Sequence, residues 1–238
     1  MAGFPGFPKE MAAFFRGLRK NNDRDWFQAR KETFEEKVKA PMVELVNAVN
    51  ATLAKSAPEF VTDPKHAIYR IYRDTRFSKD KTPYKDHIAA SFEPRAFGRH
   101  AGAGLYFGLG DKQVEIGGGL YMIDPERILL IRNLLAERHE EFRDLTGEKR
   151  FRELAGEVQG EKLSRPPKGF APDHPAIDLL KHKQWYFFVT LESELALTPK
   201  LQPEIEKRLL AMVPVLRFLN EPLHAAARKK ERAAKMLE

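Results

Sequence analysis

The 238-residue sequence contains no cysteine, which excludes disulfide bonds, thiolate nucleophiles, cysteine-bound zinc and iron–sulfur clusters. It also lacks an apolar run long enough to span a bilayer, and its first thirty residues do not combine a basic start with a long apolar stretch. We therefore expect a soluble, cytoplasmic protein that does not bind membranes. The length and the apolar content of 42% favour a folded chain with a substantial core.

Familiar catalytic motifs are missing as well. The seven histidines form no HxH, HxxxH or HExxH pair, so we expect no metal site. There is no GxSxG serine-hydrolase elbow and no GxxxxGK[ST] phosphate loop. Asp86 and Asp173 each precede a histidine, but neighbouring side chains on a strand point to opposite faces, which argues against Asp–His pairs. The sequence thus identifies no reaction and no cofactor, and it leaves open whether the protein is an enzyme.

Positive charge is concentrated in two segments. The net charge of +7 and the pI near 9.5 are compatible with nucleic-acid binding. Residues 65–100 hold 9 basic and 4 acidic side chains, a net charge of +5, and residues 217–238 hold 6 and 3, a net charge of +3. The remaining segments are close to neutral. This distribution favours a localised site for a small anion over a surface that binds a long polyanion.

Apolar residues at helical spacing predict helices over most of the first sixty residues, over about 124–142 and from 198 onward. Within the segment NNDRDWF, Asn22 and Asp23 are predicted to cap a helix and Trp26 to pack beneath it. Pro203 and Pro214 are expected to interrupt or restart the last helical region.

A period of two, with many aromatic and β-branched residues, predicts five strands at 67–73, 87–92, 104–109, 113–120 and 185–191. Short loops with no intervening helix join the first four of these strands and favour an antiparallel meander. We predict a single α+β domain, 1–238, in which an antiparallel sheet of about five strands packs against N-terminal, middle and C-terminal helices. Its core would span about 7–220, followed by a basic helical tail at 221–238.

The densest cluster of charged side chains lies in the stretch RIYRDTRFSKDKTPYK, from Arg70 to Lys85. On a strand, Arg70 and Arg73 would point to opposite faces, so one of them would face the buried side. A buried guanidinium needs a carboxylate or an anionic ligand. The planar guanidinium suits bidentate binding of phosphate or carboxylate. We predict a pocket in which several cations bind a small anion, one carboxylate orients an arginine and one hydroxyl donates a hydrogen bond. The residues in these roles are Arg70, Arg73, Arg76 and Lys81 as cations, Asp74 as the orienting carboxylate, and Tyr84 as the donor.

Arg24 would reach the same pocket if the start of its helix lies over the sheet. If the site also carries out chemistry, Asp74 or Tyr84 would be the proton-transfer group. The competing interpretation is an internal salt-bridge network in which Asp74 and Asp80 neutralise the cations, since structural ion pairs produce the same sequence pattern.

The pattern RxxRDxRFxxDKxxY, present from Arg70 to Tyr84, resembles the signature of the bacterial and fungal family called domain of unknown function 2461. NNDRDWF, the glycine-rich GAGLYFGL and GGGLYMIDP, and PPKGFAPDHP are similar to other segments of that family. The resemblance extends from about Phe7 to the last helical region. It implies no reaction and no catalytic residue. It does favour a site at the arginine cluster, because surface salt bridges rarely define a family.

Three hypotheses follow. The first is a pocket for a small phosphate- or carboxylate-bearing ligand. The second is a non-enzymatic nucleic-acid-binding protein that uses residues 65–100 and the basic tail. The third is a structural or partner-binding module held by internal salt bridges. The sequence does not determine the oligomeric state.

Overall fold

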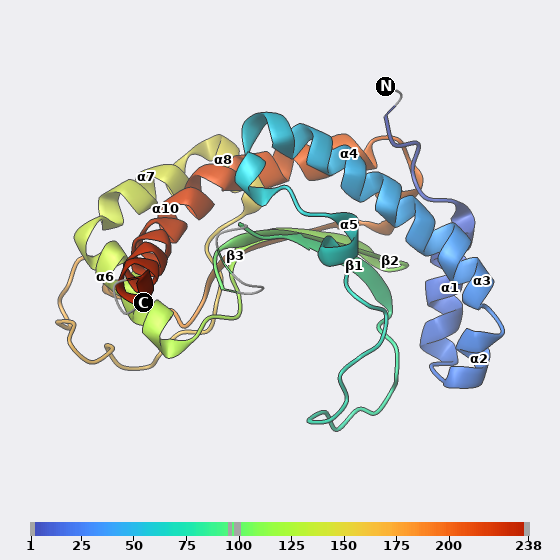
Figure 1. Ribbon diagram of the computed structural model, residues 1–238, viewed down its shortest axis with the longest axis horizontal. Helices are drawn as coiled ribbons and strands as arrows, with labels where there is room; N and C mark the ends of the chain where they lie inside the picture. Colours follow the sequence, from blue (N-terminus) through green and yellow to red (C-terminus); the bar gives the residue numbers. More distant parts are fainter. Residues whose placement is uncertain (1–2, 95–96, 98–100, 236–238) are drawn as a thin grey trace. The chain divides into compact units, whose positions relative to one another are not determined.

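The computed structural model describes residues 3–94, 97 and 101–235, with side chains up to residue 228 (Figure 1). It is an α+β structure with one antiparallel sheet of four strands in the order β1-β2-β3-β4. The strands are β1 (His87–Phe92), β2 (Gly104–Gly110), β3 (Gln113–Leu120) and β4 (Trp185–Glu192). The helical elements are α1 (Lys9–Lys20), α2 (Arg24–Gln28), α3 (Lys31–Phe34), η1 (Glu35–Lys39), α4 (Ala40–Ser56), η2 (Pro58–Phe60), α5 (Pro64–Ala67), α6 (Pro125–Glu137), α7 (His139–Gly147), α8 (Lys149–Ala155), α9 (Ile177–Leu180), η3 (Ser193–Leu197) and α10 (Leu201–Lys235).

The chain forms two compact units. The first contains Met1–Phe92, Tyr106–Ile116 and Thr190–Lys207, and the second contains Glu93–Leu105, Gly117–Val189 and Arg208–Glu238. Strands of the sheet therefore contribute residues to both units.

In the first unit, α1, α2 and α3 are grouped beside the start of α4 (Figure 1). Helix α1 is amphipathic and buries Met11, Phe14, Phe15 and Leu18. A β-carbon at Gly17 would lie 2.6 Å from the Trp26 ring, so glycine allows α2 to pack closely against α1. The predicted apolar stripe of α4 is confirmed, since its members are all buried: Met42, Leu45, Val46, Val49 and Leu53.

The predicted strand at 67–73 is wrong, and the sheet has four strands instead of five. The Asp63 side chain accepts a hydrogen bond from the Lys65 backbone N–H, and Pro64 fits the first helical position, so residues 64–67 form the short helix α5. The following residues make only isolated antiparallel bridges, between Ile68 and Ala90 and between Tyr72 and Tyr84. The side chains still alternate between the two faces of the chain, although the backbone hydrogen bonds of a strand are not continuous. Arg70, Tyr72 and Asp74 are exposed, whereas Ile71 is buried.

In the second unit, the Asp124 carboxylate accepts a hydrogen bond from the Arg127 backbone N–H at the start of α6. Asn220 joins α10 to the start of β2, where its amide donates to the Ala103 carbonyl at 2.9 Å and accepts from the Ala103 N–H at 2.8 Å. Both groups are buried, so this pair satisfies backbone atoms that would otherwise lack partners.

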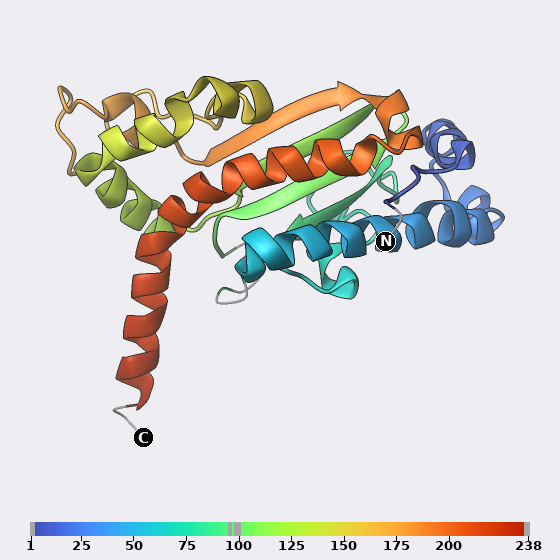
Figure 2. The same cartoon turned by 90° about the horizontal axis from the view of Figure 1, so that it is seen from above.

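The expected interruption at Pro214 is wrong, because α10 continues through Pro214 and also through Pro222, whereas Pro203 lies in its first turn. Each proline removes one backbone hydrogen bond, which bends a helix without necessarily ending it, and Figure 2 shows that α10 bends in its second half. Residues 221–235 of the expected tail form the last part of α10. The last residues of the tail and the side chains from 229 onward lie outside the described part of the chain. None of the helices described is both long and apolar enough to cross a bilayer.

Candidate functional site

The arginine-rich cluster lies on the connection between α5 and β1, which extends away from both elements in Figure 1. Two backbone hydrogen bonds join its arms: Arg73 N–H donates to Pro83 O at 2.9 Å, and Lys85 N–H donates to Ile71 O at 2.8 Å. Together with the bridge between Tyr72 and Tyr84, they hold the connection as a short hairpin whose tip is formed by residues 74–82. We call residues 68–86 the basic hairpin.

The turn between α1 and α2 anchors this hairpin. The Asn22 side chain donates to the carbonyl oxygen of Tyr84 and accepts from its N–H, both at 3.0 Å. The Tyr84 ring stacks on Phe27 of α2, with ring centroids 4.2 Å apart and an interplanar angle of 17°. Asp23 caps α2 by accepting from Trp26 N–H at 2.8 Å, as predicted. Asn22, predicted as a cap, instead binds a backbone segment sixty-two positions away in sequence.

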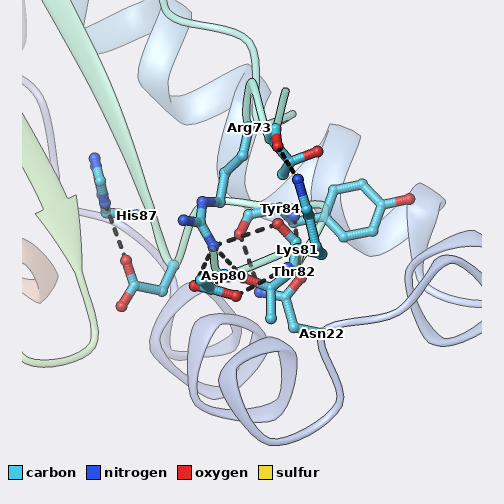
Figure 3. Close-up of polar contacts among 9 residues, drawn as sticks. Asn22, Arg73, Asp80, Lys81, Thr82, Tyr84 and His87 are labelled. Atoms are coloured by element: carbon cyan, nitrogen blue, oxygen red, sulfur yellow. Dashed lines mark hydrogen bonds and ion pairs between the residues drawn. The ribbon is translucent and has the colours of Figure 1, made fainter. Parts of the chain in front are cut away.

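Two of the predicted cations form ion pairs within the hairpin. Arg76 binds Asp74 through two hydrogen bonds of 3.0 and 2.8 Å. The Nη1 of Arg73 donates to Asp80 and to the hydroxyl and carbonyl oxygens of Thr82 (Figure 3). These contacts are the ones that the salt-bridge interpretation predicts.

The two aspartates are correspondingly acidic. The side-chain hydrogen bonds from Arg76 lower the pKa of Asp74 from 3.8 to about 2. The pKa of Asp80 also falls from 3.8 to about 2, mainly because the Thr82 N–H donates to its carboxylate and secondly because Arg73 does. Both carboxylates therefore stay ionised at neutral pH and keep their arginines oriented.

A pocket of about 370 Å³ lies between α2 and the hairpin, and we call it the cationic pocket. The structure brings three of the predicted site residues to its wall: Arg24, Arg73 and Tyr84. The other four predicted residues do not line it: Arg70, Asp74 and Arg76 are exposed, and Lys81 donates to the Thr75 carbonyl at 2.8 Å. The remaining lining residues are Gln28, Tyr72, Thr75 and Pro83.

These additional residues were not predicted from the sequence as part of a site. Gln28 had a usable signal, because it follows Arg24 by four positions and therefore shares its face of α2. Thr75 and Pro83 had none, since only the backbone pairing of the two arms places them at the pocket wall.

Hydrogen-bonding capacity in the cationic pocket is only partly used. Within the described residues, the Arg24 side chain makes no hydrogen bond and no ion pair, and all side-chain hydrogen bonds of Arg73 come from Nη1. The Nε and Nη2 of Arg73 can therefore donate to a ligand. Burial raises the pKa of Tyr84, so its hydroxyl keeps its proton and remains a donor at neutral pH.

A second pocket, of about 390 Å³, lies at the hairpin of β2 and β3, and we call it the acidic pocket. Its wall includes Asp86, His87, Asp111 and Glu115. Contrary to expectation, one of the two adjacent Asp–His pairs is in contact here, since Asp86 Oδ1 lies 3.1 Å from His87 Nδ1 (Figure 3). Asp86 precedes β1 rather than belonging to it, so strand alternation does not separate the two side chains.

The negative charge of the acidic pocket is partly balanced by Lys112 on its wall and by contacts of its carboxylates. Arg19 of α1 forms an ion pair with Asp111, and Glu115 accepts from the side-chain amide of Gln113 at 2.6 Å. In the described part of the chain, no three histidine, aspartate or glutamate side chains are placed to hold a metal ion.

Comparisons of the whole chain with known proteins gave one match. No curated protein and no solved structure matches it. A family model described as "Conserved hypothetical protein (DUF2461)" matches residues 10–218, a range that contains the basic hairpin and both pockets. The chain therefore belongs to the family of conserved hypothetical proteins DUF2461.

Proposed function

We propose that the protein binds a small anionic ligand, bearing a phosphate or carboxylate group, in the cationic pocket. The observation that carries the proposal is the unused hydrogen-bonding capacity of Arg24 and Arg73 in a pocket without a carboxylate among its lining residues. Asp80 and Thr82 hold Arg73 from one side, so its remaining N–H groups are oriented before a ligand arrives. Such preorganisation lowers the entropic cost of binding.

Ion pairing and anion binding are compatible at this site. The Asp80 carboxylate uses one nitrogen of Arg73, and an anion would use the other two, as in a bidentate arginine–phosphate contact. Arg24 would supply the second charge, and Tyr84 and Thr75 would contribute hydroxyl donors. The proposal therefore assigns Asp80 a positioning role and retains Arg24, Arg73 and Tyr84 as ligand contacts.

A thermal-shift and calorimetric titration with inorganic phosphate and with succinate tests this proposal. A ligand that binds only the native state raises the melting temperature. We expect Arg24→Met and Arg73→Met to weaken binding at least tenfold, because hydrogen bonds to charged groups contribute about 1.5–3 kcal/mol. Arg70→Met is the matched control, since Arg70 lies on the same hairpin outside the pocket.

Two results would contradict the proposal. The first is the absence of any stabilisation of the wild-type protein by either anion. The second is an unchanged affinity in Arg24→Met, a variant whose native residue is exposed and makes no ion pair within the described structure. A lower melting temperature of Arg73→Met without an anion response in the wild type would instead favour a purely structural role for the salt bridges.

Nucleic-acid binding is the second candidate, and one observation favours it. Phe77 at the tip of the basic hairpin is 95% exposed, and the Arg76 guanidinium lies 5.7 Å from its ring centroid. Exposed aromatic rings beside cations bind single strands by stacking and charge. An oligonucleotide titration at increasing salt tests it: steep loss of affinity and a dependence on Phe77 would support it, and no binding at low salt would exclude it.

A further inference from the structure

One wall of the cationic pocket is an aromatic ring that the anion-binding proposal does not use. Tyr72 lines the pocket and is 46% exposed. Its ring centroid lies 5.3 Å from that of Tyr84 and 6.2 Å from that of Phe27, and both of these rings are buried. Tyr72 is thus supported by a buried aromatic cluster while a large part of its surface remains open to a ligand.

The backbone fixes the position of this ring. Tyr72 pairs with Tyr84 across the arms of the hairpin, between the hydrogen bonds made by Ile71 and Arg73. Tyr84 is in turn fixed by Asn22 and Phe27. A ring that is already ordered loses little entropy when a planar group stacks on it, which makes it an effective binding surface.

The size and polarity of the pocket also exceed what a simple anion needs. Its volume of about 370 Å³ falls in the range, roughly 300–1,000 Å³, of pockets that hold small organic ligands. The Gln28 amide, on the wall of the same pocket, can both donate and accept hydrogen bonds. This capacity suits the polar edge of a heterocycle or a sugar hydroxyl better than it suits the oxygens of a carboxylate or of a dianionic phosphate ester, which only accept.

We propose that the ligand of the cationic pocket is a phosphate monoester that carries a planar aromatic ring, with the ring stacked on Tyr72 and the phosphate bound by Arg24 and Arg73. The inference rests on the proposed anion-binding function and narrows it to one class of ligand. A nucleoside monophosphate and an aryl phosphate share this chemistry, and they differ in the sugar between ring and phosphate.

Isothermal titration with four probes separates the parts of the proposal: inorganic phosphate, ribose 5-phosphate, adenosine 5′-monophosphate and phenyl phosphate. Stacking of one base on an aromatic side chain increases affinity by about tenfold or more. We expect at least one of the two aromatic phosphates to bind about tenfold more tightly than ribose 5-phosphate. Tighter binding of the nucleotide would identify a nucleoside phosphate, and tighter binding of phenyl phosphate would identify an aryl phosphate.

Variants of Tyr72 test the stacking contact itself. Tyr72→Leu should lower the affinity for the preferred aromatic phosphate about tenfold and leave that for inorganic phosphate unchanged, whereas Tyr72→Phe should restore the wild-type affinity. Tyr121→Leu is the matched control, because Tyr121 is 67% exposed and does not line this pocket. An equal loss for all probes in Tyr72→Leu would show that Tyr72 only shapes the pocket, which would overturn the stacking inference.

The two proposals fail in different ways. If inorganic phosphate and ribose 5-phosphate bind as tightly as the aromatic phosphates, the aromatic ligand class is wrong and the anion site remains. If none of the four probes binds to the wild-type protein, both proposals are wrong.

Discussion

The two pockets of the first unit are almost equal in volume, about 370 and 390 Å³, but they are built differently and carry opposite charge. The acidic pocket is formed by neighbouring residues of β2 and β3 and by the start of β1, so strand pairing alone assembles it. The cationic pocket requires α2 to contact a hairpin more than forty residues further along the chain. Its existence depends on a few long-range contacts.

In the cationic pocket, the residues that hold the wall together differ from the residues that carry the charge. Asn22, Phe27 and Tyr84 hold the cationic pocket together, whereas Arg24 and Arg73 supply its charge. In the acidic pocket the charged side chains lie on or next to the strands that build it. Substitutions that disrupt long-range contacts should therefore affect the cationic pocket strongly and the acidic pocket weakly.

The largest expected effect is that of Phe27→Ala. Phe27 is 2% exposed and packs against Tyr84, Phe14 and Phe34. Its truncation should lower the free energy of unfolding by about 3–5 kcal/mol, as for other buried aromatic residues. Urea denaturation measures this change, and phosphate titration should show a weakened response. Full stability combined with an unchanged phosphate affinity would contradict the role of Phe27 as the base of the cationic pocket.

A smaller effect is expected for Asn22→Ala, which removes both side-chain hydrogen bonds to the Tyr84 backbone. The loss leaves a partly buried N–H and C=O unpaired, so the free energy of unfolding should fall by about 1–3 kcal/mol. Asn21→Ala is the matched control, since the exposed Asn21 side chain donates only to Gly17 O within its own helix end. Equal changes in the two variants, measured by urea denaturation, would contradict the anchoring role of Asn22.

Acid should affect the basic hairpin only at low pH. The pKa values of Asp74 and Asp80 are lowered from 3.8 to about 2 in the folded protein. A lowered pKa means that the carboxylate stabilises the native state above pH 4 and that this contribution is lost as the pH falls toward 2. Carboxyl chemical shifts followed by NMR should therefore titrate near pH 2. Titration of Asp80 near pH 4 would show that Arg73 and Thr82 do not hold it.

The smallest effect is expected for Glu115→Gln in the acidic pocket. The glutamine retains an oxygen that can accept a hydrogen bond from Gln113 or Tyr106, and it removes one negative charge from a partly exposed position. Its stability should change by no more than about 0.5 kcal/mol, and its phosphate affinity should equal that of the wild type. A large gain in phosphate affinity would show that the acidic pocket opposes anion binding, and the two pockets would then not be independent.

Sequence patterns were sufficient where local periodicity decides the structure. The apolar stripe of α4, the positions of β1 to β4 and the cap of α6 by Asp124 follow from residues within one or two turns or one strand. The pattern failed at 67–73, whose aromatic and β-branched residues are typical of a strand. There Asp63 caps the short helix α5, and the residues that follow leave the sheet to form the basic hairpin. They therefore make isolated bridges instead of a continuous strand.

For the candidate site, the sequence located the cluster but not its geometry. Residues from Arg70 to Tyr84 form one hairpin, in which Asp74 pairs with Arg76 outside the cationic pocket. Only the fold distinguishes Arg73, which lines a pocket, from Arg70 and Arg76, which do not. Which arginine lines the pocket is set by the alternation of side chains along the basic hairpin and by the backbone pairing of its two arms. Neither depends on the arginine side chains themselves.

By itself, the amino-acid sequence determined the composition, the positive charge of the hairpin segment, most helices and strands, and the family to which the chain belongs. The tertiary structure decided which charged side chains form internal ion pairs and which of them line a pocket. The physical reason is that helices and strands arise from interactions between near neighbours, whereas the pocket depends on contacts such as Asn22 with Tyr84. Local patterns of residue types do not specify which distant residues meet, because those contacts form only when the core packs.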